Sequence, residues 1–435
     1  MFCSLTKLGF SLSILIGFFL IGCGGRDDFL KDSSYAKKCN LTDTACYTVS
    51  FYDENLRLIE AQSVKEGQVN PSDILLGVWY MAGEEQHTTS YNLMSNVNFY
   101  ADQNVKEITD QAGLNSVRDK LQGKYIVLED IVLDSGKEGF NASFGWEPIG
   151  SETAPFSGIF NANHHVISGL WIDRPNTSNT GLFGYVNGTK IMNVGVKIAN
   201  GKKLNGKSFV GGIAGQVVGD SLIKNSYAEG DIEGSDSDIG GIAGKMNGGK
   251  VEGSYFKGDI KGKKGIAGIV GSANDDVSII SSYSNGYISG TSSHIGGIVG
   301  WSQDSGKIEK SYSTMRLEGD GGDIGGIVGI INNSALVSNS AAINPSIKGQ
   351  TKTNRIAYSD SNTAMFSNNF ALKNMLVNGK TVSGDNGMNG IDKTNEEFKK
   401  ESTYKELGWE FGDDDEHPWK IFEDVGYPYL YWEKR

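Results

Sequence analysis

Apolar residues in the second half of the chain recur in short runs that are separated by glycine and polar turns. These runs are rich in Ile, Val and Tyr and show no helical spacing, so they predict short β-strands. One word recurs as "VGGIAGQV", "IGGIAGKM", "KGIAGIVG", "IGGIVGWS" and "IGGIVGII". Its glycine before the isoleucine falls at Gly212, Gly241, Gly265, Gly297 and Gly326.

A second word follows each copy and carries a serine. These serines are Ser226, Ser254, Ser282, Ser311 and Ser340, which step by 28, 28, 29 and 29 residues, whereas the glycines step by 29, 24, 32 and 29. Length variation therefore falls in the turn between the two words. Two weaker copies extend the array, at Val194 and Asn369.

One repeat of about 28 residues cannot bury its own apolar side, but stacked repeats can. The pattern therefore predicts a mainly β fold, a parallel β-helix (solenoid) of seven coils. The whole chain is expected to comprise a signal peptide (1–22), a lipid-anchored tether with a disulfide loop (23–46), a small strand-rich module (47–105), a capping helix (106–122), the β-helix (123–394) and a C-terminal cap (395–435).

The N-terminal segment predicts export. Lys7 is followed by an apolar run from Leu8 to Ile21 that is too short for a membrane span. The run ends in "LIGC", which resembles the bacterial lipoprotein signal box and implies lipidation of Cys23; the alternative is an ordinary secretory signal. Gly24 in place of an Asp favours the outer membrane, so we expect a lipid-anchored protein exposed at the cell surface, joined to the membrane by its N-terminal lipid.

The cysteines fit this compartment. Once Cys3 leaves with the signal and Cys23 takes lipid, Cys39 and Cys46 remain on either side of "NLTDTA". In an oxidising compartment this spacing favours a disulfide loop. A metal site is disfavoured, because two thiols without a nearby His cannot complete a tetrahedral shell.

The charge balance bears on partners. The chain has 40 Lys plus Arg against 52 Asp plus Glu, a formal net charge of −12. A nucleic-acid backbone requires a basic surface, so a nucleic-acid partner is not expected.

The repeated words resemble a known family. "GGIAG" and "GGIVG", with "GLFG" at 181–184, are similar to the GLUG motif of bacterial surface and adhesin-like proteins. Residues 123–133, 146–150 and 156–172 resemble the opening coils of that family, and "ELGWEF" and "GYPYLYWE" resemble its C-terminal end. The resemblance covers about residues 108–435. It implies adhesion, that is, non-catalytic binding of a glycan or protein on a host or neighbouring cell.

A second resemblance covers residues 47–104. The segments "VSFYDEN", "QSVKEGQ", "GVWYMAGEE", "YNLMSNV" and "NFYADQ" look like the internalin B-repeat, a small β-grasp module. The chain departs from that pattern where "DENLR" replaces a glycine-rich turn and "DQN" replaces a closing Trp. The resemblance implies a spacer or weak binder. Next, "EITDQAGLNSVRDKL" (107–121) predicts a short helix that caps the first coil.

One stretch matches a nucleotide-binding pattern. "GKKLNGKS" (201–208) fits the phosphate-binding loop G-x-x-x-x-G-K-[ST]. That loop needs a following helix, and the next residues, "FVGGIAGQVVG", are poor helix formers. We therefore expect a turn of the coil.

Catalysis on the β-helix is the alternative function. Asp231 and Asp259 lie 28 residues apart and should stack, as the carboxylates of a polysaccharide lyase or hydrolase would. The ladder stops in the next coils, which place Tyr287 and Leu317 there. No H-E-x-x-H or G-x-S-x-G motif occurs, and the acidic turns lack calcium-loop spacing, so no catalytic, metal or cofactor site is expected. A third possibility is a structural envelope protein that faces the periplasm.

Aromatic residues also repeat. Tyr227, Tyr255, Tyr283 and Tyr312 share one register and predict a stacked ladder. An exposed ladder could bind a sugar ring, whereas a buried one would stabilise the coils, which the pattern favours. "GYPYLYWE" is expected to cover the open edge of the last coil, where unpaired strands would otherwise recruit another chain.

Overall fold

The computed structural model describes residues 45–433, which fall into two units with separate hydrophobic cores. The first unit comprises 45–54 and 58–103, and the second comprises 55–57 and 104–433. Strands account for 46% and helices for 5% of the structure, so the chain is mainly β, as predicted.

The first unit is built on a three-stranded sheet in the order β2-β1-β5. β1 and β2 form an antiparallel hairpin, and β5 returns parallel to β1. Its core contains Phe51, whose ring lies 4.8 Å from Trp79 and 5.6 Å from Phe99 between centroids. The elements are β1 (Cys46–Tyr52), β2 (Leu58–Lys65), β3 (Gly67–Val69), α1 (Pro71–Ile74), β4 (Tyr91–Leu93) and β5 (Val97–Tyr100).

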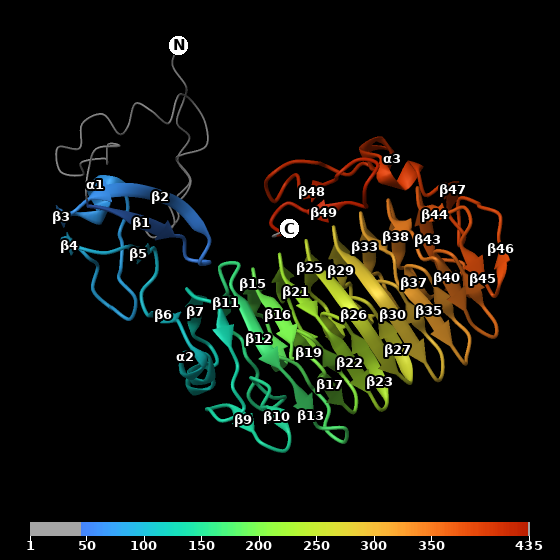
Figure 1. The fold of residues 1–435 in the computed structure, drawn as a ribbon, viewed down its shortest axis with the longest axis horizontal. Helices are drawn as coiled ribbons and strands as arrows, with labels where there is room; N and C mark the ends of the chain where they lie inside the picture. The colour runs from blue at the N-terminus through green and yellow to red at the C-terminus, as the bar shows by residue number, and fades with distance from the viewer. Residues whose placement is uncertain (1–44, 434–435) are drawn as a thin grey trace, which may run out of the picture. The chain divides into compact units, whose positions relative to one another are not determined.

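The second unit is a parallel β-solenoid of about 8 turns, which confirms the predicted fold and adds about one turn to the predicted seven (Figure 1). Each coil passes through four faces in turn. The first face is a 10-stranded parallel sheet. Its strands are β6 (Val105–Ile108), β7 (Lys124–Val127), β11 (Ile159–Asn161), β15 (Lys190–Met192), β20 (Leu222–Lys224), β25 (Lys250–Glu252), β29 (Ser278–Ile280), β33 (Lys307–Glu309), β38 (Leu336–Ser338) and β43 (Met365–Ser367).

The second face carries one long or two short strands per coil, paired in parallel with the same position of the next coil. Its strands are β8 (Ile131–Val132), β12 (Val166–Leu170), β13 (Ile172–Asp173), β16 (Gly195–Ile198), β17 (Lys203–Gly206), β21 (Tyr227–Glu229), β22 (Asp231–Gly234), β26 (Tyr255–Gly262), β30 (Tyr283–Gly290), β34 (Tyr312–Ser313), β35 (Arg316–Gly319), β39 (Ala341–Ala342), β40 (Ser346–Lys348), β44 (Phe370–Leu372), β45 (Leu376–Val377) and β47 (Ile391–Lys393).

Two shorter parallel sheets of six and seven strands complete each coil. The third face comprises β18 (Val210–Gly211), β23 (Ser237–Gly240), β27 (Lys264–Ala267), β31 (Ile295–Gly296), β36 (Ile324–Gly325) and β41 (Thr353–Asn354). The fourth face comprises β14 (Phe183–Asn187), β19 (Ala214–Val218), β24 (Ala243–Asn247), β28 (Val270–Asn274), β32 (Val299–Ser302), β37 (Val328–Ile331) and β42 (Ala357–Ser359).

The repeated serines lie at the corner between the first and second faces. Each hydroxyl accepts a hydrogen bond from the backbone N–H of its counterpart in the preceding coil, as in Ser254 N to Ser282 Oγ at 3.2 Å. Each also donates to its own chain two residues earlier, as Ser282 does to Ile280 O at 2.9 Å. The series begins at Val194 N and ends at the Asn369 side chain, so both weak copies keep the register.

The structure corrects one register. Ala243 pairs with Val270, and the Gly241 amide region therefore lies against Gly268, not Gly265. With Gly268 as the third copy, the glycines step by 29, 27, 29 and 29 residues. Ile266 after Gly265 pairs instead with Ile239 and Ile295 on the third face. "KGIAGIVG" contains two similar words in succession, and the first belongs to a strand that precedes the repeated corner.

The N-terminal end of the solenoid is closed by a shorter helix than predicted. Residues 107–108 belong to β6, and the helical part is α2 (Gln111–Asn115) followed by the 3-10 turn η1 (Ser116–Asp119). Asp110 caps α2 by accepting from Gly113 N at 2.8 Å. Leu114 and Val117 are fully buried against the solenoid core.

The C-terminal end of the last coil is closed by a hairpin between β45 and β46 (Lys380–Thr381) and by the residues up to 393. Arg355 is fully buried there and donates to the carbonyls of Asn389 and Gly390, both at 2.9 Å. It also pairs with Asp392 at 2.7 Å. A buried guanidinium with these partners can satisfy backbone carbonyls that the open coil would leave unpaired.

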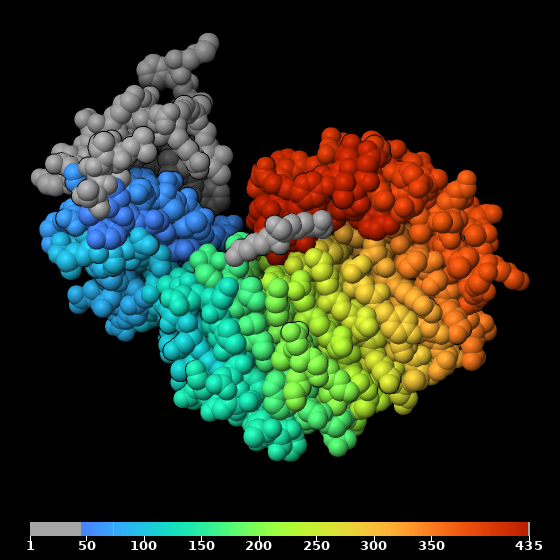
Figure 2. Space-filling model, in the orientation of Figure 1, coloured from blue at the N-terminus to red at the C-terminus, as the bar shows by residue number. Residues whose placement is uncertain are grey.

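Residues 394–433, the C-terminal segment, do not cover that end, contrary to expectation. They fold back along the flank of the earlier coils (Figures 1 and 2). Trp409 donates to Asn339 O at 2.7 Å and Tyr312 donates to Pro428 O at 2.6 Å, contacts that place the segment at the corner between the first two faces. Its elements are η2 (Glu397–Lys399), α3 (Glu401–Glu406), β48 (Trp419–Lys420) and β49 (Tyr429–Leu430).

Candidate binding site

The repeated tyrosines form the predicted ladder. Adjacent rings from Tyr227 to Tyr312 are stacked with centroids 4.8, 4.9 and 4.9 Å apart. Tyr283 is 2% exposed. The C-terminal segment covers the ladder: Trp432 stacks on Tyr255 at 5.6 Å, and Trp419 lies 5.8 Å from Tyr312. The ladder is therefore buried, as the sequence favoured, and its faces are not open to a sugar.

The phenol groups of the ladder also hold the segment. Tyr283 donates to the Glu433 carboxylate at 2.9 Å, which Lys257 contacts at 3.2 Å. Burial, with the Glu229 carboxylate nearby, raises the pKa of Tyr227 to about 12. Burial likewise raises the pKa of Tyr283, so these hydroxyls remain protonated donors.

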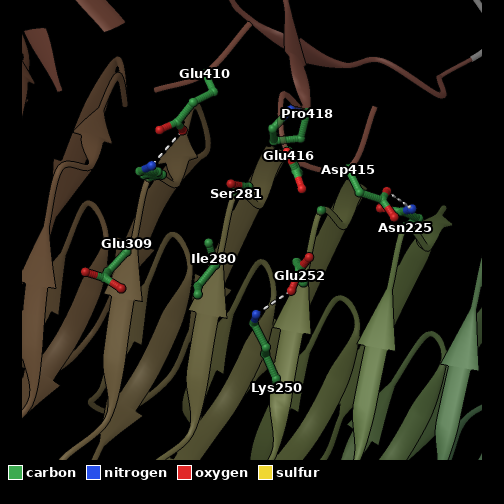
Figure 3. A pocket seen from close by; sticks show the side chains of 12 residues that line it. Asn225, Lys250, Glu252, Ile280, Ser281, Glu309, Glu410, Asp415, Glu416 and Pro418 are labelled. Atoms are coloured by element: carbon green, nitrogen blue, oxygen red, sulfur yellow. Dashed lines mark hydrogen bonds and ion pairs between the residues drawn. The ribbon is translucent and has the colours of Figure 1, made fainter. Parts of the chain in front are cut away.

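A cleft of about 400 Å³ lies between the C-terminal segment and the first face (Figure 3). One wall comes from the ends of successive coils, and the other comes from the loop before β48. The lining residues are Asn225, Lys250, Glu252, Gly253, Ile280, Ser281, Glu309, Lys310, Glu410, Asp415, Glu416 and Pro418.

The coil wall owes its shape to the solenoid corner. The residue before each ladder serine has a positive φ, 48° at Asn225, 56° at Gly253 and 49° at Ser281. Asn and Gly tolerate this left-handed conformation well. The turn ends the first-face strand at the same point in each coil, so the side chains that precede it line up along the cleft.

Ion pairs bind the two walls together. Lys224 lies 3.0 Å from both the Glu252 and the Asp415 carboxylates, and Lys310 lies 2.6 Å from Glu410. Lys250 pairs with Glu252 within β25. Asn225 donates to Asp415 at 2.9 Å (Figure 3).

These contacts shift the titration of the groups. Burial alone would raise the pKa of Glu252, but hydrogen bonds from Lys250 and Lys224 outweigh it and lower that pKa. Burial also opposes the ionised form of Asp415, whose pKa is lowered by Asn225, Lys224 and Tyr431. For Lys224, burial is overcome by the two carboxylates, which raise its pKa. All three groups are therefore charged at neutral pH.

Two carboxylates in the cleft have no cationic partner among residues 45–433. Glu309 accepts only from the Ser338 hydroxyl at 3.1 Å, and the exposed Glu416 side chain lies on the opposite wall. The lysines near the cleft are all paired, as described above. The cleft therefore offers acidic hydrogen-bond acceptors to a ligand, and its preferred partners are hydroxyl or amino groups.

The sequence-predicted residues lie elsewhere. Asp231 and Asp259 are adjacent and exposed on the second face, and Asp259 accepts from Tyr287 N at 3.1 Å. The ladder continues to Arg316, not to Leu317, which points inward and is buried. Lys203 occupies the same position in the coil before Asp231. The two aspartates are thus flanked by basic residues in a row of surface charges.

The nucleotide-binding pattern lacks its required context. Lys203–Gly206 is strand β17, and strand β18, not a helix, follows Ser208. The stretch is part of a coil, as predicted. Cys23 and Cys39 lie outside the described residues, and Cys46 opens β1, so lipidation and the disulfide stay predictions.

Within residues 45–433, no group of three or more His, Cys, Asp or Glu side chains is arranged to hold a metal ion. In the same part of the chain, no helix has the length and apolarity needed to cross a bilayer. His165 lies 3.1 Å from Asp130, whereas the neighbouring His164 ring lies 6.0 Å from that of Trp432. The two adjacent histidines thus have different partners.

Sequence reasoning did not find the cleft. Its residues come from four coils and from a segment about 100 or more positions later in the chain, as the Lys310–Glu410 pair shows. The one available signal was the acidic run "GDDDE" (412–416) facing lysines of the repeat.

Comparison with known proteins agrees with the solenoid. Residues 210–233, from β18 to β22, match the GLUG motif family. No curated protein matches this chain. Among solved structures, the crystal structure of a candidate immunoglobulin A1 protease from Bacteroides ovatus is similar, with a TM-score of 0.51 and 20% sequence identity. The match covers 76% of this chain and 93% of that chain, and at this identity it shows the fold alone.

Proposed function

We propose that this chain is a surface-displayed, non-catalytic binding protein that is tethered through lipid on Cys23 and recognises a glycan. The cleft beneath the C-terminal segment is its proposed binding site. The signal box at residues 20–23 and the GLUG match at 210–233 support an exported, adhesin-like role.

The observation that carries the proposal is the charge arrangement of the cleft. Its lysines are neutralised by Glu252, Asp415 and Glu410, while Glu309 and Glu416 stay unpaired on facing walls. Paired groups hold the walls in place, and unpaired carboxylates can accept hydrogen bonds from sugar hydroxyls or amino groups. A preorganised polar cleft of this kind binds without ordering its own side chains first.

The test is a glycan binding assay on the mature chain, made soluble by Cys23→Ser. We expect binding to neutral or amino-sugar glycans that weakens about tenfold in Glu309→Gln and in Glu416→Gln, since each removes a charged acceptor. Glu129→Gln, an exposed carboxylate outside the cleft, is the matched control and should bind normally. Equal binding by all three variants would exclude the cleft.

Other activities are outcomes of the same preparation. The similar Bacteroides ovatus structure is named for immunoglobulin A1 proteolysis. Cleavage of immunoglobulin A1, or release of reducing ends from a polysaccharide that is lost in Asp231→Asn or Asp259→Asn, would replace binding with catalysis. Absence of any ligand, together with a periplasmic location, would support the structural envelope role.

A further inference from the structure

A second surface on the solenoid combines exposed aromatic rings with free cations. It lies at the opening coils, around β9 (Phe140–Asn141), β10 (Gly145–Trp146) and β13 (Figure 1). We call Phe140, Phe144, Trp171, Arg174 and Lys202 the aromatic platform. Phe144 is 50% exposed, and Trp171 is partly exposed.

The rings and cations of the platform are in direct contact. The Phe140 and Trp171 ring centroids are 5.7 Å apart. The Arg174 guanidinium carbon lies 5.4 Å from the Phe144 centroid, and Lys202 Nζ lies 4.9 Å from that of Trp171. Two cation–π pairs thus meet within three short segments of chain.

Backbone hydrogen bonds hold the platform in shape. The Asn141 side chain accepts from Ser143 N at 2.9 Å and from Phe144 N at 3.2 Å, which fixes the turn that carries Phe144. Asp173 N donates to Phe144 O at 3.0 Å. Gly145 has a φ of 75°, and a Cβ there would lie 2.3 Å from Trp171 O, so glycine is required for this close approach.

The two cations are unpaired. Within residues 45–433, neither Arg174 nor Lys202 forms an ion pair, whereas Lys197, Lys203 and other lysines of the same solenoid do. The nearby Asp173 carboxylate accepts from Asn205 at 2.7 Å. Arg174 Nε is buried without a hydrogen-bond partner. In a chain of net charge −12, two free cations on exposed rings indicate an anionic ligand.

We propose that the aromatic platform binds an acidic sugar. The C–H face of the sugar ring packs on the exposed parts of Phe144 and Trp171, because aliphatic hydrogens complement the negative face of an aromatic ring. The carboxylate of the sugar accepts hydrogen bonds from Arg174, whose planar guanidinium matches a carboxylate in a bidentate pair. Lys202 adds a second positive charge. The proposal rests on the proposed function only in that both assign carbohydrate; the site and the charge of its ligand differ from those of the cleft.

The probe is a polygalacturonate oligomer, titrated into the soluble mature chain by calorimetry. Its fully methyl-esterified form is the matched ligand control, because it keeps the sugar ring and removes the negative charge. Arg174→Gln tests the cation and Trp171→Ala tests the ring. Lys245→Gln is the matched protein control, since Lys245 lies 5.5 Å over Phe209 on another part of the solenoid. Thermal unfolding of each variant checks that it is folded.

We expect the unmodified oligomer to bind and the esterified form to bind about tenfold or more weakly, since a charge-assisted pair is lost. Arg174→Gln and Trp171→Ala should each lose affinity to a similar degree, and Lys245→Gln should not. Equal binding of both oligomers, unchanged affinity in folded Arg174→Gln, or no binding of the acidic oligomer would each overturn the proposal. Neutral glycans binding through Glu309 would still stand, so failure here is distinct from failure of the cleft.

Discussion

Buried serine hydroxyls occupy the same place in five successive coils and each satisfies two backbone groups. Ser226, Ser254, Ser282, Ser311 and Ser340 are at most 0% exposed. The corner turn removes a backbone N–H and a carbonyl from the strand ladders, and the hydroxyl supplies both an acceptor and a donor for them. This explains why the serine repeat keeps a steadier spacing than the glycine repeat assumed from sequence.

The ladder predicts a specific stability loss. Ser282→Ala leaves the buried Ser254 N–H and Ile280 carbonyl without their partner, which should cost about 1–3 kcal/mol of unfolding free energy. Ser305→Ala, at an exposed turn, should change it by less than about 0.5 kcal/mol. Urea unfolding compares the two. Equal stability of both variants would contradict the role given to the ladder.

At the scale of elements, the C-terminal segment and the coils are joined by aromatic stacking and by the ion pairs of Lys224. The sequence predicted strands, repeats and the stacked tyrosines, because each is encoded in local periodicity. It misplaced the C-terminal segment, since whether Trp419 and Trp432 pack on the end or the flank of the solenoid depends on contacts with Tyr312 and Tyr255. It also misplaced the Gly265 register, where two similar words overlap.

Docking of the C-terminal segment should weaken in acid. The pKa values of Glu252 and Asp415 are lowered from their ordinary 4.5 and 3.8, so their stabilising effect is present above those values and is lost as the pH falls through the lowered ones. Lys224 has a raised pKa and keeps its charge throughout that range.

The measurement is quenching of tryptophan fluorescence by acrylamide between neutral pH and about pH 2. We expect Trp409, Trp419 and Trp432 to become accessible below about pH 4, and at a higher pH in Lys224→Gln, because the carboxylates then lose the cation that lowers their pKa. A pH profile that is identical in the variant would show that these ion pairs do not hold the segment.

At the scale of the whole molecule, the solenoid separates stability from recognition. Its interior is uniform, with isoleucines such as Ile242, Ile269 and Ile298 fully buried in register, so each coil depends mainly on its neighbours. The differences lie outside, in the acidic cleft near the C-terminal segment and the basic aromatic platform at the opening coils. Sequence periodicity predicts the interior well. Neither surface was predictable, because each combines side chains from different coils or distant segments.

The most direct test of the account is whether the solenoid is displayed outside the cell. An antibody raised against the folded protein is applied to intact cells and to cells with an opened outer membrane, with a periplasmic protein as control. We expect intact cells to be labelled while the periplasmic control is not, and labelling to be lost from cells that express Cys23→Ser, which lacks the lipid. Labelling only after the outer membrane is opened would contradict surface binding and place the protein in the periplasm.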